Sequence, residues 1–364
     1  MTRILILMVS FLAISAAGPA SPARASDTDD TFRAITKASV YDHIIPRYEH
    51  LATAGTGLET AATAYCQDRT AQNFTTLDTA FRNYWIAWAG IRHIQFGPVQ
   101  FLNRGFRIQF WPDTRNKIGR QLSRVLAAED SAALEHATFA KTSIAVQGLP
   151  ALERLLADGD AGYAAPKGSF KCALTTTIAS NLAIAAKGIV DNWNPTDGYA
   201  HAVAMAGTGE GPYSETYEVT VELLQSLLGE LEASRDVRLG RPLGSELDKA
   251  RPKLAEAWRS GLSRDILVAS LKGTEDLYLS GGFDQALRDA GENTLADQIT
   301  AGFQQAVTQS RALEGSLYDA FTAPEKREAL QAIRADLKVL AGLIGTDLAV
   351  ALDISPGFNS RDGD

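Results

Sequence analysis

The chain has 364 residues, of which 45% are hydrophobic and 21% are charged, and its formal net charge at pH 7 is −8. This composition supports a substantial buried core, excludes an intrinsically disordered chain, and gives enough length for two ordinary domains. The acidic balance argues against nucleic acid as a partner, because nucleic-acid-binding surfaces are basic.

The first 25 residues have the pattern of a secretory signal peptide. Arg3 precedes an apolar run over 4–16, and the letters ARA at 23–25 form a small-x-small cleavage site. We expect cleavage after Ala25 and a periplasmic product. The run is too short to span a membrane and no later uninterrupted apolar run is long enough, so we expect no transmembrane segment.

Two cysteines, Cys66 and Cys172, follow in the first half of the chain. In an oxidising compartment two cysteines most simply form one disulfide. The alternative is two buried free thiols, since free cysteine packs well as a small hydrophobe.

The stretch over 83–115 combines aromatic and polar residues. Its aromatic side chains are typical of a core; they are Trp85, Trp88, Phe96, Phe110 and Trp111. Its polar side chains need partners if they are buried, so they either pair with one another or face a cleft; they are Arg92, His93, Arg107 and Asp113. Asp113 has a second interpretation as a cap, because residues 114–128 are predicted to form a helix.

A second informative stretch is AVQGLPALERLL at 145–156. Gly148 interrupts the preceding helical pattern, and Pro150 suits the first turn of a new helix. Glu153 then lies in that first turn, where the helix dipole favours a carboxylate. These structural roles are sufficient to explain the pattern G-x-P-x-x-E without any function.

Most of the chain has helical periodicity. Apolar residues recur at spacings of three and four, most strongly over 223–231, 295–307 and 330–344. Thr322 and Glu325 have the spacing of a capping box and predict a helix start. No series of alternating segments indicates a sheet, so we predict an all-α fold with antiparallel, up-down helices. The Gly- and Pro-rich segment over 192–213 is the predicted boundary between two halves.

Common catalytic signatures are missing from the sequence. It contains no H-E-x-x-H, no G-x-S-x-G, no Walker loop and no Rossmann fingerprint. The five histidines are scattered, so local spacing does not indicate a His-rich metal site.

The chain resembles the imelysin family, the M75 peptidase-like, iron-regulated periplasmic proteins. The resemblance rests on the segment Trp88–Pro98, on RIQFWPD at 107–113, on VQGLPALERLL at 146–156 and on the ending GFNSRDGD. It implies two helical-bundle domains, a cleft near the family motif, and a role in iron or haem uptake. We accordingly predict an N-terminal domain over 26–195, a linker over 196–213 and a C-terminal domain over 214–364.

The family motif is G-x-H-x-x-E, whose His and Glu share a helix face and could hold one metal. Here Pro150 occupies the histidine position. The resemblance to a metallopeptidase is weakened at this residue, because a lone carboxylate is a poor metal site. A metal site with substitute ligands would use His93 and Asp113 together with Glu153.

The sequence therefore favours a non-catalytic binding protein for iron, haem or an iron-related ligand. We predict that the ligand site lies in a cleft near Glu153, lined by Arg92, His93, Arg107, Asp113, Gln147 and Glu153. Proteins of an iron-uptake system are the expected partners. One alternative is that Arg92 or Arg107 forms a structural ion pair with Glu153. Others are an M75-type metallopeptidase, and a partner-docking protein without a small ligand.

Overall fold

The structure is a computed structural model that describes residues 22–163 and 168–354. Most of the predicted signal peptide and the ending GFNSRDGD lie outside the described residues. The described chain is helical and contains no strand, so the fold is all-α. Its first helices are α1 (Pro22–Ala38), α2 (Ile45–Gln67), α3 (Ala71–Ala89), α4 (Arg104–Ile108), α5 (Lys117–Ala128), α6 (His136–Phe139), α7 (Leu149–Leu156) and α8 (Gly168–Asn192). The remaining helices are α9 (Tyr199–Ala204), α10 (Thr216–Glu232), α11 (Arg241–Leu243), α12 (Ser263–Ser280), α13 (Phe283–Asp289), α14 (Asn293–Ala312), α15 (Leu317–Ala320), α16 (Pro324–Gly342) and α17 (Ala349–Ala351).

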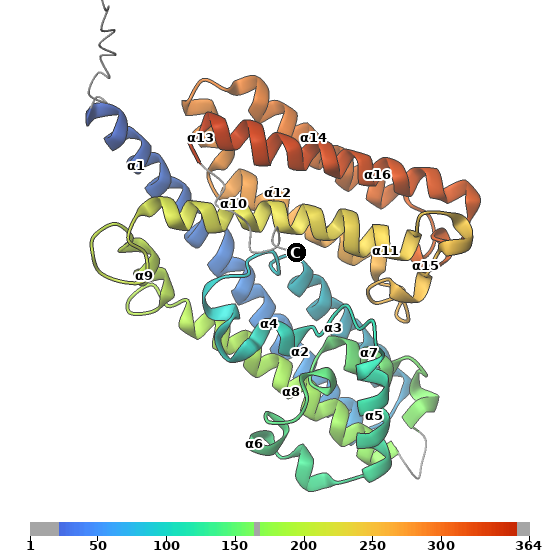
Figure 1. The fold of residues 1–364 in the computed structure, drawn as a ribbon. Coiled ribbons are helices and arrows are strands. Elements are labelled where there is room, and N and C mark those ends of the chain that lie inside the picture. The colour runs from blue at the N-terminus through green and yellow to red at the C-terminus, as the bar shows by residue number, and fades with distance from the viewer. Residues whose placement is uncertain (1–21, 164–167, 355–364) are drawn as a thin grey trace, which may run out of the picture.

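The long helices form two bundles, seen in Figure 1 as a lower blue-to-green group and an upper yellow-to-red group. In the first bundle α2 packs between α3 and α8. In the second, α12 packs on α10 and α14, and α16 packs on α14 and α10. The apolar stripes predicted over 223–231, 295–307 and 330–344 face the interior of the second bundle; Leu227, Phe303 and Leu337, for example, are fully buried.

Helix α1 belongs to the first half of the sequence but packs on the second bundle. It continues through a π-helical turn, η1 (Ser39–Ile44), directly into α2, so one helical rod contacts both bundles (Figure 1). Phe32 of α1 meets Tyr217 of α10 edge-on, with ring centroids 5.8 Å apart. The Ser39 hydroxyl donates to the carbonyl of Gly281 at 3.0 Å. The rod therefore fixes the position of one bundle against the other.

The segment predicted as a linker, 196–213, is ordered by side-chain contacts. It contains α9, and the Tyr199 ring packs edge-on against Trp193 at 5.1 Å. The hydroxyls of Tyr199 and Tyr213 are hydrogen-bonded at 2.7 Å, which closes the segment into a loop. The predicted division into domains at this point stays a prediction.

A disulfide joins the two longest helices of the first bundle. Cys66 on α2 and Cys172 on α8 are bonded, as in the first of the two sequence alternatives. Helix α8 is also long and apolar enough to cross a membrane by length and composition over 169–192, but 56% of its most apolar window is buried inside the protein. Its contacts with α2 run along the first bundle, as expected of a core helix.

One helix start differs from the predicted capping pattern, and another has a capping box that was not predicted. Helix α16 begins at Pro324, and its N-cap residue Ala323 makes no side-chain capping bond. The hydroxyl of Thr322 instead donates to the carbonyl of Asp319, so the capping box predicted there is wrong. A capping box does form at α10, between Glu215 and Glu218.

Candidate functional site

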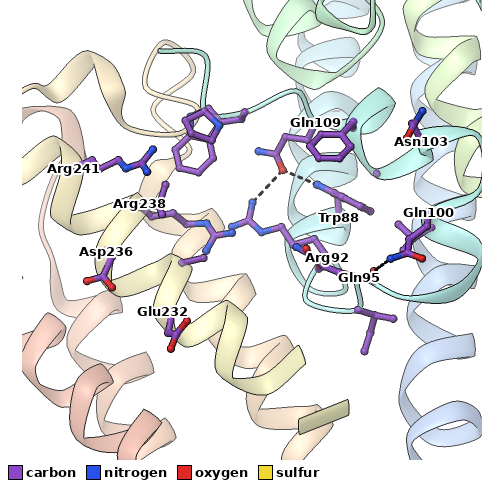
Figure 2. A pocket seen from close by; sticks show the side chains of 18 residues that line it. Trp88, Arg92, Gln95, Gln100, Asn103, Gln109, Glu232, Asp236, Arg238 and Arg241 are labelled. Carbon is purple, nitrogen blue, oxygen red and sulfur yellow. Dashed lines mark hydrogen bonds between the residues drawn. The ribbon is translucent and has the colours of Figure 1, made fainter. Parts of the chain in front are cut away.

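A cleft of about 750 Å³ lies between the two halves of the chain and is called here the large cleft. One wall is the segment 88–112, and the other is 232–241, which includes the π-helical turn η7 (Ala233–Gly240). Figure 2 shows Arg92 and Arg238 extending toward each other from opposite walls. Aromatic and amide side chains also line the cleft, with Trp88, Phe106 and Gln109 among them, and the second wall adds the carboxylates Glu232 and Asp236. This volume lies within the range of small-molecule sites in proteins.

Two arginines that line the large cleft, Arg92 and Arg238, belong to a buried network with two carboxylates behind them, Glu230 and Glu256. Arg92 and Arg238 both contact Glu256, and Arg238 also lies 2.9 Å from Glu230. Arg92 donates to the Ser270 hydroxyl at 2.8 Å. The two positive and two negative charges balance, so the network meets the requirement that buried charges be paired.

Glu256 is the centre of this network. Its Oε1 accepts hydrogen bonds from Trp85 at 3.2 Å and from Gln109 at 2.5 Å, in addition to Arg92. Burial by itself would raise the pKa of Glu256, but the charges of Arg92 and Arg238 outweigh burial and hold that pKa at about 2. The carboxylate is therefore ionised at neutral pH and fixes the orientation of both guanidinium groups.

Glu153 is buried, with 4% exposure, and its Oε1 is bound to the second half of the chain. This oxygen accepts from the backbone N–H groups of Arg259 and Ser260, at 3.1 and 3.0 Å, and from the Ser260 hydroxyl at 2.9 Å. Burial raises the pKa of Glu153, and the Ser260 donors and the Arg259 charge oppose the rise only in part. Glu153 thus acts as a cap for a loop of the other half.

The local sequence positions Glu153 by close packing. Gly148 is the N-cap of α7, and a Cβ there would lie 2.4 Å from the carbonyl oxygens of Arg107 and Ile108, so a side chain is excluded. Pro150 lies in the first turn of α7, where a missing N–H costs no helical hydrogen bond. The pattern G-x-P-x-x-E therefore serves to bring α7 close to its neighbours.

A smaller cavity of about 360 Å³ adjoins Glu153. Trp111 and Pro112 line both this cavity and the large cleft, so the two cavities are neighbours. The smaller cavity, called here the Glu153 cavity, is also lined by Asp113, Arg154, Lys253, Trp258 and Arg259.

The predicted site residues have different neighbours. Arg92 lines the large cleft, while Asp113 and Glu153 line the Glu153 cavity. Asp113 accepts two backbone N–H bonds at the start of α5, at 2.7 and 2.8 Å, and so caps that helix. Arg107 and Gln147 are hydrogen-bonded to each other at 3.0 Å and to backbone carbonyls of the first half, and they line neither cavity. Arg92 pairs with Glu256, and Arg107 is bonded to Gln147. The alternative in which either arginine pairs with Glu153 is therefore wrong.

His93 is hydrogen-bonded within a chain of buried side chains. Nε2 of His93 lies 2.8 Å from Nε2 of His43, whose Nδ1 lies 2.8 Å from Asp276 on α12. If His43 donates to Asp276, it accepts from His93, which leaves Nδ1 of His93 as a buried acceptor without a partner in the part of the chain described. Burial lowers the pKa of both imidazoles, so both are neutral at pH 7.

These positions do not form the metal site considered from the sequence. Within residues 22–163 and 168–354, no group of three or more His, Cys, Asp or Glu side chains is arranged to hold a metal ion. His93, Asp113 and Glu153 each have hydrogen-bond partners of their own instead. A bare metal ion does not fit these residues.

The sequence interpretation missed Arg238, which lines the large cleft, and the buried carboxylates Glu230 and Glu256, which pair with the arginines of the cleft. One signal was present for Glu230, because this charged residue falls within the apolar stripe over 223–231 and is 3% exposed. A carboxylate in a buried helical stripe requires a cationic partner. No local pattern indicates that Arg92, far away in the sequence, supplies part of that charge.

Comparison with known proteins decides the family. A sequence model described as imelysin, or peptidase M75, matches residues 44–344. The chain belongs to the imelysin family. No curated protein matches this imelysin.

Two solved structures share the imelysin fold seen here. An imelysin-like protein from Psychrobacter arcticum 273-4 is similar with a TM-score of 0.77 and 24% identity, over 91% of this chain and 98% of that one. A structure described as a "putative iron-regulated protein A precursor" from Parabacteroides distasonis ATCC 8503 gives a TM-score of 0.70 and 13% identity, over 91% and 96% of the two chains. These likenesses establish the fold.

Proposed function

We propose that this imelysin is a non-catalytic periplasmic binding protein of iron uptake, and that it holds an iron complex in the large cleft. The observation that carries the proposal is the construction of the cleft, in which aromatic and amide groups surround arginines held rigid by the buried network. Preorganised donors of this kind bind ligands without a cost in side-chain ordering. The name of one structural neighbour, an iron-regulated protein, supports the link to iron.

The chemistry of the lining favours a complex over a bare ion. Among the described residues no set of His, Cys, Asp and Glu side chains fits a metal directly. Within the described part of the chain, the large cleft is also lined by no His, Met, Cys or Tyr that could serve as an axial haem ligand. Arg241 lines the cleft and makes no ion pair with any residue described. The ligand that fits best is therefore a ferric ion already bound by an anionic chelator.

Titration calorimetry of the purified protein tests this function. We expect saturable binding of ferric citrate that is weakened about tenfold in Arg241→Ala, because one cation of the cleft is removed. Haem and ferric nitrilotriacetate are titrated in parallel as probes of the ligand class. The matched control is Arg124→Ala, an exposed arginine on α5 outside the cleft. Absence of binding for all three iron compounds, or equal binding by both variants, contradicts the proposal.

A further inference from the structure

The Glu153 cavity carries more positive charge than its own carboxylates neutralise. Arg154, Lys253 and Arg259 line it, and within the described residues none of the three forms an ion pair. Arg154 donates to the side-chain oxygen of Asn116 at 2.9 Å, which is a neutral partner. The cations come from both halves of the chain, with Arg154 on α7 and the other two on the segment 253–259.

Both carboxylates that line this cavity are bound to backbone N–H groups. Asp113 uses both of its oxygens to cap α5, and Glu153 uses Oε1 for the loop that contains Ser260. The charge of Glu153 raises the pKa of Arg259, but the charge of Arg154 has the larger effect and lowers that pKa. Burial lowers the pKa of Arg259, and the charge of Arg154 lowers it further. The electrostatic potential at this cavity is therefore positive, and a bound anion would be stabilised there.

An aromatic frame holds the Arg259 guanidinium at the cavity. Its central carbon lies 4.1 Å from the centroid of the Trp258 ring, and Trp258 stacks on Tyr318 with centroids 5.3 Å apart. A guanidinium held by its face keeps its edge N–H groups available to a carboxylate or phosphate. The Lys253 ammonium lies 6.0 Å from the same Trp258 ring, which places a second cation nearby.

We propose that the Glu153 cavity binds a small oxyanion with two or more negative charges. This site is distinct from the ligand site of the proposed function, because among the described residues the two cavities share only Trp111 and Pro112 in their linings. The cavity volume of about 360 Å³ is at the lower end of the range for small-molecule sites. The bound oxyanion contacts Arg154 from the first half and Arg259 from the second, so its binding also stabilises the interface between the halves.

The test is titration of the iron-free protein with citrate and with inorganic phosphate, followed by calorimetry and by tryptophan fluorescence. We expect saturable binding of at least one of the two anions, weaker at high salt because the attraction is electrostatic. Arg259→Gln should weaken binding about tenfold, and Arg154→Gln with Arg259→Gln should abolish it. Far-UV circular dichroism and thermal unfolding verify that each variant is folded.

Two controls separate this site from the proposed function. Arg124→Gln, an exposed change elsewhere on α5, should leave anion affinity unchanged. Arg241→Ala should weaken ferric citrate binding in the large cleft and leave phosphate affinity unchanged, because Arg241 does not line the Glu153 cavity. The proposal is overturned if neither anion binds saturably to the wild-type protein, or if the Arg154/Arg259 double variant binds as tightly as the wild type.

Discussion

The Glu153 carboxylate is a structural bond between two distant parts of the chain. Its Oε1 satisfies two backbone N–H groups and one hydroxyl in the loop that contains Ser260. That loop includes Ala257, whose φ of 51° lies in the left-handed region that disfavours residues with a Cβ. Three hydrogen bonds to one oxygen hold this loop against α7.

We predict that Glu153→Ala lowers the free energy of unfolding by about 2–4 kcal/mol, because it leaves buried donors without an acceptor. Glu153→Gln keeps a carbonyl acceptor and should cost about 1 kcal/mol or less. Urea unfolding at pH 7 measures both, with Glu328→Ala on the exposed face of α16 as control. If the Ala and Gln variants are equally stable, the side-chain oxygen is not what holds the loop.

Glu153 also makes the stability of the protein depend on pH, and the direction of its pKa shift gives the sign. The pKa of Glu153 is raised in the folded protein above its ordinary value of 4.5. Its contribution to stability is therefore full below pH 4.5 and is lost as the pH rises through the folded-state pKa. Unfolding curves from pH 4 to pH 8 should show a smaller loss of stability in Glu153→Gln than in the wild type. An equal loss in the two proteins would assign this pH dependence to other groups.

At the scale of single residues, the sequence was informative about local roles. The cap at Asp113 and the helix start at Gly148 and Pro150 follow from turn and helix-end chemistry, which depends on neighbours in the sequence. The partners of Arg92 and Glu153 could not be predicted, because Glu256 and Ser260 lie more than 100 residues away from them. Local patterns contain no information on contacts at that separation.

At the scale of elements, the short segment 256–260 contacts the first half at both of its ends. Glu256 binds Arg92, and the backbone N–H of Ser260 binds Glu153. Arg82 of α3 also donates to the carbonyl of Ser260 at 3.0 Å. The π-helical turn η7 adds Arg238 to the same cluster. One five-residue segment thus anchors the second bundle to the first.

We predict that Glu256→Gln lowers the free energy of unfolding by about 3–5 kcal/mol at pH 7, because two buried guanidinium groups are left with one carboxylate. The pKa of Glu256 is lowered from 4.5 to about 2. Its stabilisation is therefore full above pH 4.5 and is lost as the pH falls toward 2. Acid unfolding is followed by circular dichroism. The loss of stability as the pH falls should be smaller in Glu256→Gln than in the wild type and in a Glu328→Gln control. Parallel acid transitions in all three proteins would contradict this assignment.

Helices were predictable as elements, and their ends were less so. The stripes over 223–231 and 295–307 lie in α10 and α14, and the stripe over 330–344 lies in α16 and the π-helical turn that follows it, because burial of one face at 3.6-residue spacing is a local property. The capping box at Thr322 and Glu325 failed because Pro324 starts α16 and the Thr322 hydroxyl turns back to Asp319. Competing local hydrogen bonds of this kind are common for Ser and Thr.

At the scale of the whole molecule, the disulfide joins two positions of the first bundle that are far apart in the sequence. Cys66 and Cys172 are 106 residues apart, and a loop of that length restricts the unfolded chain strongly. We predict that changing both cysteines to alanine lowers the free energy of unfolding by about 4–5 kcal/mol. Urea unfolding with and without dithiothreitol measures this, and the reductant should have no effect on the double variant. Equal midpoints for the wild type in both conditions would show that the bond adds no stability.

The all-α class was predictable, but the joining of the two halves was not. Composition and periodicity identify helices, and the Gly- and Pro-rich segment predicts a boundary between the two halves. The large cleft, by contrast, exists only because the segments 88–112 and 232–241 meet in space. The sequence indicated that polar side chains of the first segment pair or face a cleft, but nothing in it identified 232–241 as the opposite wall.

The position of α1 has a consequence for the order in which the protein folds. This helix comes first in the chain, yet its packing partner α10 follows much later: Thr216 donates a hydrogen bond to Asp29 across 187 residues. In a chain that is synthesised from its N-terminus, α2, α3 and α8 can assemble while α1 still has no partner. The apolar face of α1 that includes Phe32 then stays accessible until the second bundle arrives, and during that interval it is open to a chaperone or to another copy of the chain.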